Sequence, residues 1–522
     1  MPHQAIEQWL IDKPVVRSAG GVVAAQNARA ASVGAEILRE GGNAVDAAVA
    51  TAFTLGVVEP WMSGLGGCGY LLSYQSQTAD VAAVDFGTAA PRALDAGAFA
   101  LESGANYDSD LFGWPRVTGD RNVHGPLSIG LPGTVAGLAL AHQRFGRLPW
   151  RELLQPAVEL ARDGHRVDWW STLKIAGEAA ALRSYAAAAS IYLPDGLPPV
   201  GPADGSLALD LGALAGTLER LATVGPEDFY QGEIAHGLAK DVAAAGGWLS
   251  AGDLADYRAT AAAPRTLRRG GAEIHLLEGL NAGPTFAAAL AQLPALPAGA
   301  PGPEGFAALA QALWAATQDR LARLGHDGDP AGQGAGQAST TQVSVADREG
   351  NLVALTNTLL SLFGSKVLSP STGVLLNNGV MWFDPTPGRP NSIAAGKRPL
   401  SNMCPLLVTR GGAPWFALGA SGGRRILPSV FQLTAFLVDC ALSPDEAVCH
   451  PRLNVDGGPF VEADPRLGRA TIEAVAAALP LREVEALVSP NHYANPLIAG
   501  WEGETAFAAA QPRSPASAAV GA

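Results

Sequence analysis

The character of the sequence changes sharply just before Thr340, and this change limits the folds that the chain can adopt. From about residue 148 to 324, Ala and Leu recur at helical spacing between Pro and Gly turns, which predicts a layer of helices. Residues 325–338 are rich in Gly and polar residues and lack apolar periodicity, so we expect a flexible linker there. After the linker, apolar and polar residues alternate around the turn-forming segment 347–351, which predicts a β-hairpin. A boundary between a helical part and a strand-rich part therefore lies just before Thr340.

Length and composition indicate a globular protein that crosses no membrane. The chain has 522 residues, 48% of them hydrophobic and 16% charged, which is enough to bury one large core or two smaller ones. The apolar stretch 44–58 contains Asp46 and falls short of the roughly 20 residues that span a bilayer. Residues 1–17 lack the charged leader, the apolar run and the cleavage site of a signal peptide. We expect a cytoplasmic protein with no membrane partner.

Charge, cysteines and histidines argue against several classes of ligand. The net charge of −13 disfavours a nucleic-acid partner, because binding phosphates requires a basic face. The cysteines are scattered in mostly apolar surroundings, so we expect buried, reduced thiols at Cys68, Cys404, Cys440 and Cys449. The nine histidines show no spacing typical of metal ligands, and we expect neither a metal nor a cofactor.

A helical hairpin precedes a glycine-rich segment in the first part of the chain. Gly41 and Gly42 end a first Ala-rich helix, and Asn43 is placed to cap a second one. The segment 64–69 then matches the dinucleotide-binding pattern GxGxxG, but a helix precedes it and a strand-like segment follows, which is the reverse of the dinucleotide context. We interpret these glycines as allowing close backbone packing at a core strand.

Thr340 is a candidate nucleophile. Its hydroxyl stands at the start of a core strand, directly after the linker, where self-cleavage of the backbone would leave a new N-terminus. The freed α-amine, with a pKa of about 8, could accept the proton of the Thr340 hydroxyl. Positions 340 and 358 are equally far from Glu349, so we expect Thr358 to face Thr340 on the next strand unless a bulge shifts the pairing. Ordinary strand-forming threonines would give the same pattern.

Two later segments carry groups suited to binding an acyl substrate. The segment 419–424 is a glycine-rich turn ahead of an apolar helical stretch, and its N–H groups could stabilise an oxyanion, although a turn without a catalytic role would look the same. The segment 396–405 is a basic loop with hydroxyl and amide side chains.

These segments, together with the helical hairpin, resemble the γ-glutamyltransferase family, also called γ-glutamyl transpeptidase or glutathione hydrolase. The resemblance covers nearly the whole chain. It includes further motifs in the family's order, namely Leu65–Gly67, Leu131–Gly137, Gln155–Gly164, Asp228–Tyr230 and Gly373–Asn378.

The resemblance implies an α+β fold, the four-layer αββα sandwich of the N-terminal nucleophile hydrolases. It also implies a proenzyme that cleaves between Ser339 and Thr340, so that residues 1–339 become a large subunit and residues 340–522 a small one. The processed unit could associate as a homodimer.

Residue by residue, the resemblance gives Thr340 the role of nucleophile and Thr358 that of the supporting hydroxyl. Gly422 and Gly423 match the oxyanion glycines. Ser401 and Asn402 match the pair of polar residues that hold the carboxylate of the donor substrate. The implied reaction is acyl transfer from a small-molecule amide, through an acyl-enzyme, to water or an amine.

The sequence departs from the family at the positions that bind the glutamyl group. Typical members have an arginine after the Asp-Phe pair, where this chain has Gly87. Their tandem aspartates, which hold the α-ammonium, correspond to Met381 and Trp382. Asn378 is followed by Gly379, and a position that is usually Asn holds Leu360.

An ammonium without its carboxylate binds poorly in a dry site, so we expect a less zwitterionic acyl group. Trp382 would then form an apolar wall, and Arg424, Arg425 or Arg92 could hold a remaining carboxylate.

Two alternatives stay open. The chain could be a dedicated hydrolase, such as an oxamate amidohydrolase or an enzyme similar to cephalosporin acylases. It could also be an uncleaved, non-catalytic protein that binds a metabolite, although the presence of Thr340, Thr358, Gly422 and Gly423 argues against this.

Overall fold

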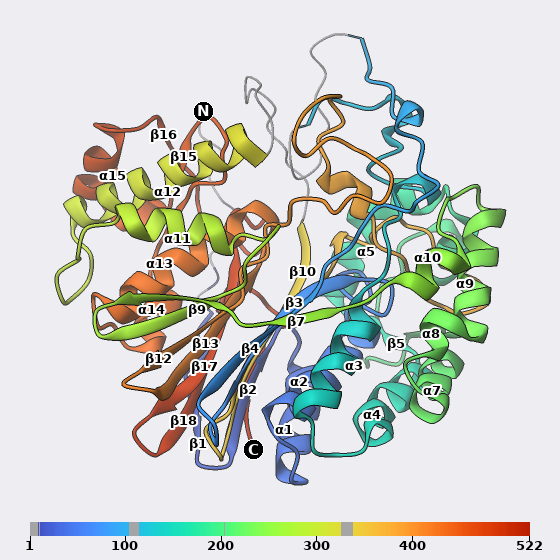
Figure 1. Ribbon diagram of the computed structural model, residues 1–522, viewed down its shortest axis with the longest axis horizontal. Coiled ribbons are helices and arrows are strands. Elements are labelled where there is room, and N and C mark those ends of the chain that lie inside the picture. The colour runs from blue at the N-terminus through green and yellow to red at the C-terminus, as the bar shows by residue number, and fades with distance from the viewer. Residues whose placement is uncertain (1–8, 10, 104–113, 203, 325–337) are drawn as a thin grey trace.

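Two antiparallel sheets are stacked face to face at the centre of the computed structural model (Figure 1). The structure describes residues 9, 11–103, 114–202, 204–324 and 338–522, so nearly all of the predicted linker lies outside the described residues. Sheet A has the strand order β1 (Val16–Ser18), β18 (Thr505–Ala510), β17 (Asn495–Glu502), β13 (Ala413–Ser421), β12 (Leu406–Arg410), β9 (Ala272–Leu276) and β8 (Arg265–Arg269). Sheet B has the order β19 (Ala518–Gly521), β2 (Gly21–Ala25), β10 (Ala338–Asp347), β11 (Leu352–Ser361), β3 (Cys68–Gln75), β4 (Asp80–Phe86) and β7 (Thr260–Ala262).

Helices cover the outer face of each sheet (Figure 1). On the side of sheet B lie α1 (Ala28–Arg39), α2 (Ala44–Val58), α3 (Thr134–Phe145), α4 (Trp150–Asp163), α5 (Trp169–Leu182), α6 (Ala186–Tyr192), α7 (Leu214–Val224), α8 (Asp228–Gln231), α9 (Glu233–Ala244) and α10 (Ala251–Asp256). On the side of sheet A lie α11 (Gly283–Gln292), α12 (Pro303–Leu324), α13 (Ile426–Val438), α14 (Pro444–Cys449) and α15 (Arg469–Ala476). Short strands β5 (His165–Arg166), β6 (Ala208–Leu209), β14 (Leu453–Asn454), β15 (Val461–Ala463) and β16 (Leu481–Glu483) lie outside the sandwich. The predicted four-layer αββα sandwich is confirmed.

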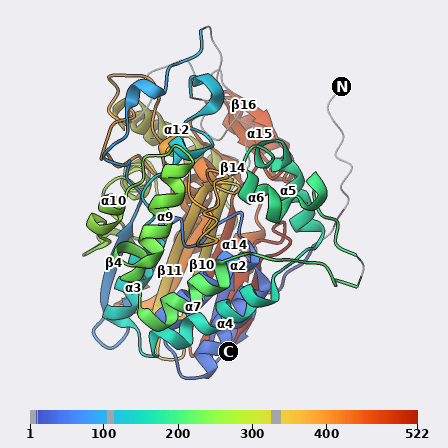
Figure 2. The same ribbon diagram turned by 90° about the vertical axis from the view of Figure 1, so that its right-hand side faces the viewer.

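The helix α2 supports the central hairpin of sheet B from behind. All of its residues from Ala44 to Leu55 are buried, because the helix packs on β10 and β11 on one side and on α4 on the other. Its first turn is fixed by Asn43, whose side chain accepts hydrogen bonds from the N–H groups of Val45 and Asp46 at 3.0 Å, as the sequence predicts. Figure 2 views the molecule from the side of this helical layer, with β10 and β11 behind it.

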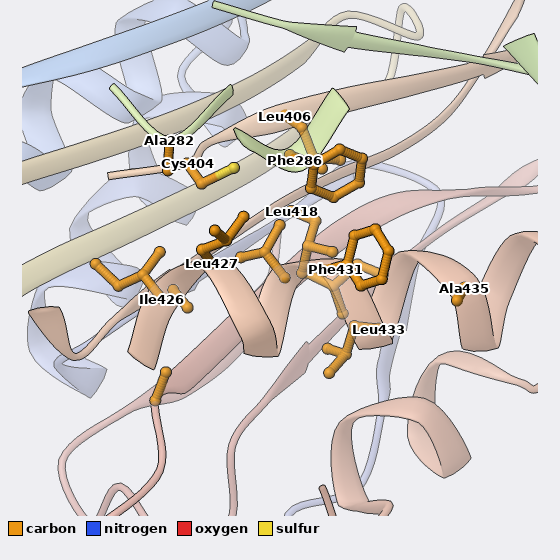
Figure 3. Packing of buried hydrophobic residues seen from close by; sticks show 14 of the residues in the cluster. Ala282, Phe286, Cys404, Leu406, Leu418, Ile426, Leu427, Phe431, Leu433 and Ala435 are labelled. Atoms are coloured by element: carbon orange, nitrogen blue, oxygen red, sulfur yellow. The ribbon is translucent and has the colours of Figure 1, made fainter. Parts of the chain in front are cut away.

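Aromatic and aliphatic side chains fill the space between sheet A and its helices. Phe286 of α11 meets Phe431 of α13 edge to face, with ring centroids 5.2 Å apart, next to Leu406 and Leu418 of the sheet (Figure 3). Burying such side chains contributes about 1.5–3 kcal/mol each. This packing fixes α13, and with it the turn that precedes α13, against sheet A.

The segment between residues 148 and 324 is not purely a helical layer, so this prediction was partly wrong. It also supplies β8 and β9 of sheet A, which are joined by Gly270 and Gly271 at φ values of 56° and 75°. Each of these strands has only five residues, so neither stands out in the sequence from the helical periodicity of the neighbouring segments.

All four cysteines are free. Cys68, Cys404 and Cys440 are buried as predicted, but Cys449 at the end of the short helix α14 is exposed, which contradicts the prediction for that residue. Among the described residues, no helix combines the length and the apolar character that a membrane crossing requires.

The glycine-rich segment 64–69 packs closely on the backbone of neighbouring segments, as the sequence analysis proposed. A Cβ atom at Gly66 would lie 2.2 Å from the carbonyl oxygen of Leu375, and one at Gly67 would lie 2.5 Å from that of Thr358. The absence of these side chains lets the loop approach β11 at the level of Thr358.

We therefore predict that Gly67→Ala lowers the free energy of unfolding by about 1–3 kcal/mol, because the new methyl group would push against the Thr358 backbone. The matched control is Gly177→Ala on the exposed face of α5, where nothing lies within 4 Å and the change should stabilise the helix by about 0.8–1 kcal/mol. Urea denaturation followed by circular dichroism measures both changes. Equal stability of the two variants would contradict this account of the loop.

Candidate active site

Thr340 lies opposite Thr358, at a one-residue bulge in the β10–β11 hairpin. The pairs Val343–Leu355 and Thr341–Asn357 follow the register predicted from the sequence, but the pairing shifts beyond Thr341 so that Ser339 lies opposite Leu360. The hydroxyl oxygen of Thr340 lies 3.2 Å from that of Thr358. The predicted contact is therefore confirmed, with Thr340 inside the bulge.

Both hydroxyl groups gather at the carbonyl oxygen of Ser339. The Thr340 hydroxyl contacts this oxygen, and the Thr358 hydroxyl donates to it at 2.5 Å. The N–H of Leu360 donates to the Thr358 oxygen at 2.8 Å and so orients it. Thr340 is only 3% exposed. The arrangement brings two hydroxyl groups to one buried peptide carbonyl, a geometry suited to a backbone acyl shift.

Gln342, which the sequence analysis did not single out, connects this hairpin to sheet A. Its Oε1 atom accepts a hydrogen bond from the hydroxyl of Thr356 at 2.7 Å. Its side chain fills the space beside Gly419 of β13, where a Cβ atom would come within 2.2 Å of Gln342 Oε1. The strand of Thr340 and the strand that leads to the glycine-rich turn thus pack on each other across the two sheets.

The glycine-rich turn follows β13 as predicted and leads into α13. Gly422 and Gly423 have φ values of 141° and 61°, which glycine adopts without a steric penalty. A Cβ atom at Gly422 would lie 2.9 Å from the Cα atom of Ala494, so a larger residue would also displace the neighbouring loop. The short 3₁₀ helix Gly423–Arg425 contacts β10. The turn therefore lies close to the strand that carries Thr340.

The buried guanidinium of Arg320, on α12, holds the loop that contains Ser401 and Asn402. It donates to the carbonyl oxygen of Ser401 at 2.5 Å, to that of Asn281 at 3.0 Å and to Oδ1 of Asn402 at 3.5 Å. Burial, together with the positive charge of Arg424, lowers the pKa of Arg320 to about 10. Sequence patterns gave no sign of this role, because an arginine on a helix is usually a surface residue.

Leu360, whose N–H donates to Thr358, belongs to a large group of buried apolar side chains. Trp382, Met381 and Leu360 belong to one cluster of buried residues that also includes Trp114. The guanidinium carbon of Arg424 lies 5.2 Å from the centre of the Trp114 ring. Leu360 has a φ of 86°, a conformation that costs a branched side chain of order 1–3 kcal/mol.

Arg92, which the sequence analysis gave as one of three arginines for a substrate carboxylate, is paired with carboxylates of the protein itself. Arg92 is 58% exposed and is paired with Asp253 at 3.0 Å and with Asp256 at 2.5 Å. Arg425 donates to the carbonyl oxygen of Asn491 at 2.6 Å. Within the residues that the structure describes, no three His, Cys, Asp or Glu side chains are gathered as they would be around a metal ion.

We predict that Arg320→Met lowers the free energy of unfolding by about 1–3 kcal/mol, because the carbonyl groups of Ser401 and Asn281 would lose their buried donor. The matched control is Arg323→Met on the exposed side of the same helix, which should change stability by less than about 0.5 kcal/mol. Thermal unfolding measures both. Similar losses in the two variants would mean that the loop does not depend on the buried guanidinium.

Comparisons with known proteins identify the family of this chain. The profile of the family described as Gamma-glutamyltranspeptidase matches residues 30–335 and 329–521. The chain is 34% identical to the Acylase ACY 1 proenzyme of Pseudomonas sp. (strain V22), over 94% of this chain and 91% of that protein. It is 31% identical to the Glutathione hydrolase proenzyme of Escherichia coli (strain K12), over 84% of this chain and 81% of that protein.

The fold is also similar to that of a solved structure. Cephalosporin acylase from Bacillus halodurans superposes with a TM-score of 0.85 at 22% identity, covering 100% of this chain and 99% of that one. The αββα sandwich of this chain agrees with that similarity. The chain belongs to the γ-glutamyltranspeptidase family and is an enzyme of the N-terminal nucleophile hydrolase type.

Proposed function

We propose that the chain matures by cleaving the peptide bond between Ser339 and Thr340, and that the new N-terminal Thr340 then hydrolyses or transfers the acyl group of a small amide. The observation that carries this proposal is the contact of the Thr340 and Thr358 hydroxyl groups with each other and with the carbonyl of Ser339. Residues 1–339 would form the large subunit and residues 340–522 the small one.

In the maturation step, the Thr340 hydroxyl attacks the carbonyl carbon of Ser339. The bond from this carbon to the Thr340 nitrogen breaks, which leaves an ester on the Thr340 oxygen and a free α-amine. The Thr358 hydroxyl, which donates to the Ser339 oxygen at 2.5 Å, stabilises the negative charge that develops there. Water then hydrolyses the ester, so that Ser339 ends in a carboxylate.

In the catalytic cycle, the α-amine of Thr340 accepts the proton of its own hydroxyl as the oxygen attacks the amide of the substrate. The N–H groups at Gly422 and Gly423 are suited to hold the oxyanion, because the turn follows β13 and contacts β10. The amine product leaves with a proton, and water or a second amine attacks the ester on Thr340. Ser401 and Asn402 would bind the acyl group.

The acyl pocket favours a group without an α-ammonium. The buried Met381 and Trp382 offer no charge to such a group, and Leu360 adds a further apolar surface. The similarity to an acylase proenzyme at 34% identity supports an amide other than a γ-glutamyl amide, while the similarity to a glutathione hydrolase keeps the γ-glutamyl amides as the second candidate.

The test of maturation is the change Thr340→Ala. We expect the wild type to give two pieces split before residue 340 and the variant to remain a single chain of 53.4 kDa without amidase activity, because the attacking oxygen is gone. The control is Thr341→Ala, whose hydroxyl points to Ser63 at 2.9 Å, away from Thr358. This control should still mature. Denaturing electrophoresis with intact-mass measurement distinguishes the outcomes, and a processed, active Thr340→Ala protein would refute the proposal.

The test of substrate class compares γ-glutamyl p-nitroanilide with pentanoyl p-nitroanilide. Both acyl chains have five carbons, but the glutamyl chain carries an ammonium group on the fourth carbon and ends in a carboxylate where the pentanoyl chain ends in a methyl group. We expect kcat/KM to be at least about tenfold higher for pentanoyl p-nitroanilide, since an ammonium without a counter-charge costs several kcal/mol in a dry site. A strong preference for the glutamyl compound would instead favour the second candidate.

A further inference from the structure

The side chain of Ser339, the residue before the bond that we propose is cleaved, has a hydrogen-bond partner of its own. Its hydroxyl donates to the carbonyl oxygen of Met62 at 2.6 Å, and the residue is fully buried. The carbonyl oxygen of the same residue accepts from the hydroxyl of Thr358 at 2.5 Å. Ser339 is therefore held through its side chain as well as through its carbonyl group.

Met62 belongs to the loop that follows α2, and this loop has anchors that do not involve Ser339. The Met62 carbonyl oxygen also accepts from the N–H of Leu359 in β11 at 3.0 Å, and the carbonyl oxygen of Trp61 accepts from the N–H of Phe363 at 2.9 Å. Trp61 is buried, and the centroid of its ring lies 6.2 Å from that of Phe363. The loop is thus fastened to the end of β11, so the Met62 carbonyl is a fixed acceptor for the Ser339 hydroxyl.

The same loop contacts β10 on both sides of Thr340. Before this residue, Ser339 donates to Met62, and after it, the hydroxyl of Thr341 donates to Oγ of Ser63 at 2.9 Å. The pairing of β10 with β11 shifts between Ser339 and Thr341. The two contacts therefore hold the chain at the point where the ladder of strand pairs is irregular, next to the bond between Ser339 and Thr340.

A hydrogen bond to the side chain restricts the direction of the carbonyl group. An oxygen and a carbonyl carbon react quickly only when they are held close together and in the correct direction. The hydroxyl groups of Thr340 and Thr358 restrain the carbonyl oxygen of Ser339, but such contacts leave the carbonyl carbon free to turn about that oxygen. The additional bond from the Ser339 side chain to Met62 opposes this rotation.

We propose that Ser339 is a positioning residue for maturation, whose hydroxyl, held by Met62, keeps the Ser339 carbonyl carbon in line with the attacking oxygen of Thr340. This inference rests on the proposed cleavage before Thr340 and adds a side chain that acts only while the bond is intact. In the catalytic cycle the same oxygen attacks the carbonyl of a substrate, so Ser339 has to leave its place beside Thr340 before a substrate enters. The hydrogen bond to Met62 then has no part in turnover.

The experiment measures the rate of maturation of the full chain in Ser339→Ala. The chain is made by cell-free synthesis, synthesis is stopped, and the fraction split before residue 340 is followed with time by denaturing electrophoresis. We expect the rate constant of cleavage to fall at least about tenfold relative to the wild type, because the carbonyl carbon then spends less time in line with the Thr340 oxygen.

The matched control is Ser344→Ala, on the same strand. Ser344 is also fully buried, and its hydroxyl also donates to a backbone carbonyl, that of Leu497 at 3.0 Å. This variant loses a hydrogen bond of the same kind away from the cleavage site, so it should mature at the wild-type rate. Equal slowing in the two variants would mean that any buried hydrogen bond of β10 has this effect, and would overturn the inference.

Turnover separates positioning from a structural role. Once Ser339→Ala has matured completely, its kcat and KM for the p-nitroanilide that the wild type hydrolyses best should equal the wild-type values, because the lost contact is used only before cleavage. A fall in kcat/KM as large as the fall in the rate of maturation would mean that the change disturbs Thr340 itself. That result would overturn the inference, as would maturation of Ser339→Ala at the wild-type rate.

The outcomes also separate this inference from the proposed function. A wild-type chain that is not split before residue 340, or a Thr340→Ala chain that is, would refute the proposed function and this inference with it. A wild type that matures, beside a Ser339→Ala protein that matures equally fast, would overturn this inference and leave Thr340 as the nucleophile.

Discussion

The structure depends on one irregularity in an otherwise regular hairpin. In a hairpin without the bulge, the register of the pairs from Thr341 onward would continue, and Ser339 would lie opposite Leu359 instead of Leu360. At the bulge, the hydroxyl groups of Thr340 and Thr358 converge on the carbonyl oxygen of Ser339. The buried helix α2 behind the hairpin, and Gln342 on the side that faces sheet A, keep this conformation in place.

The polar groups of the candidate site lie next to a large cluster of buried apolar side chains. The cluster that contains Trp114, Met381 and Trp382 continues into the core between the sheets, so that hydrogen bonds near Thr340 form in surroundings from which water is largely removed. Such bonds are stronger than in water, and an unpaired polar group there is costly. Arg320 illustrates the cost, because its buried charge persists only with several carbonyl and amide oxygens around it.

Local patterns predicted the hairpin well, and contacts between distant segments could not be predicted. Thr340 and Thr358 are only eighteen residues apart in the sequence, so their contact follows from the predicted turn between them. The helix cap at Asn43 is equally local. The layers of the sandwich came from the resemblance to a family. In contrast, Asp85 and Arg398 are 313 residues apart, and neither spacing nor propensity indicates that they meet. The pairing of Arg92 could not be predicted for the same reason, since its partners Asp253 and Asp256 lie far along the chain.

The order of strands in the two sheets interleaves the segments before and after Thr340. In sheet B, β2 lies between β19 and β10, while β3, β4 and β7 continue from β11, and in sheet A the strands β12, β13, β17 and β18 are enclosed by β1 on one edge and by β9 and β8 on the other. A single backbone break before Thr340 would therefore leave two pieces that each contribute strands to both sheets. Neither piece could dissociate without breaking the hydrogen bonds between several pairs of strands. Such pieces would behave mechanically as one body, and separating them would amount to unfolding the enzyme.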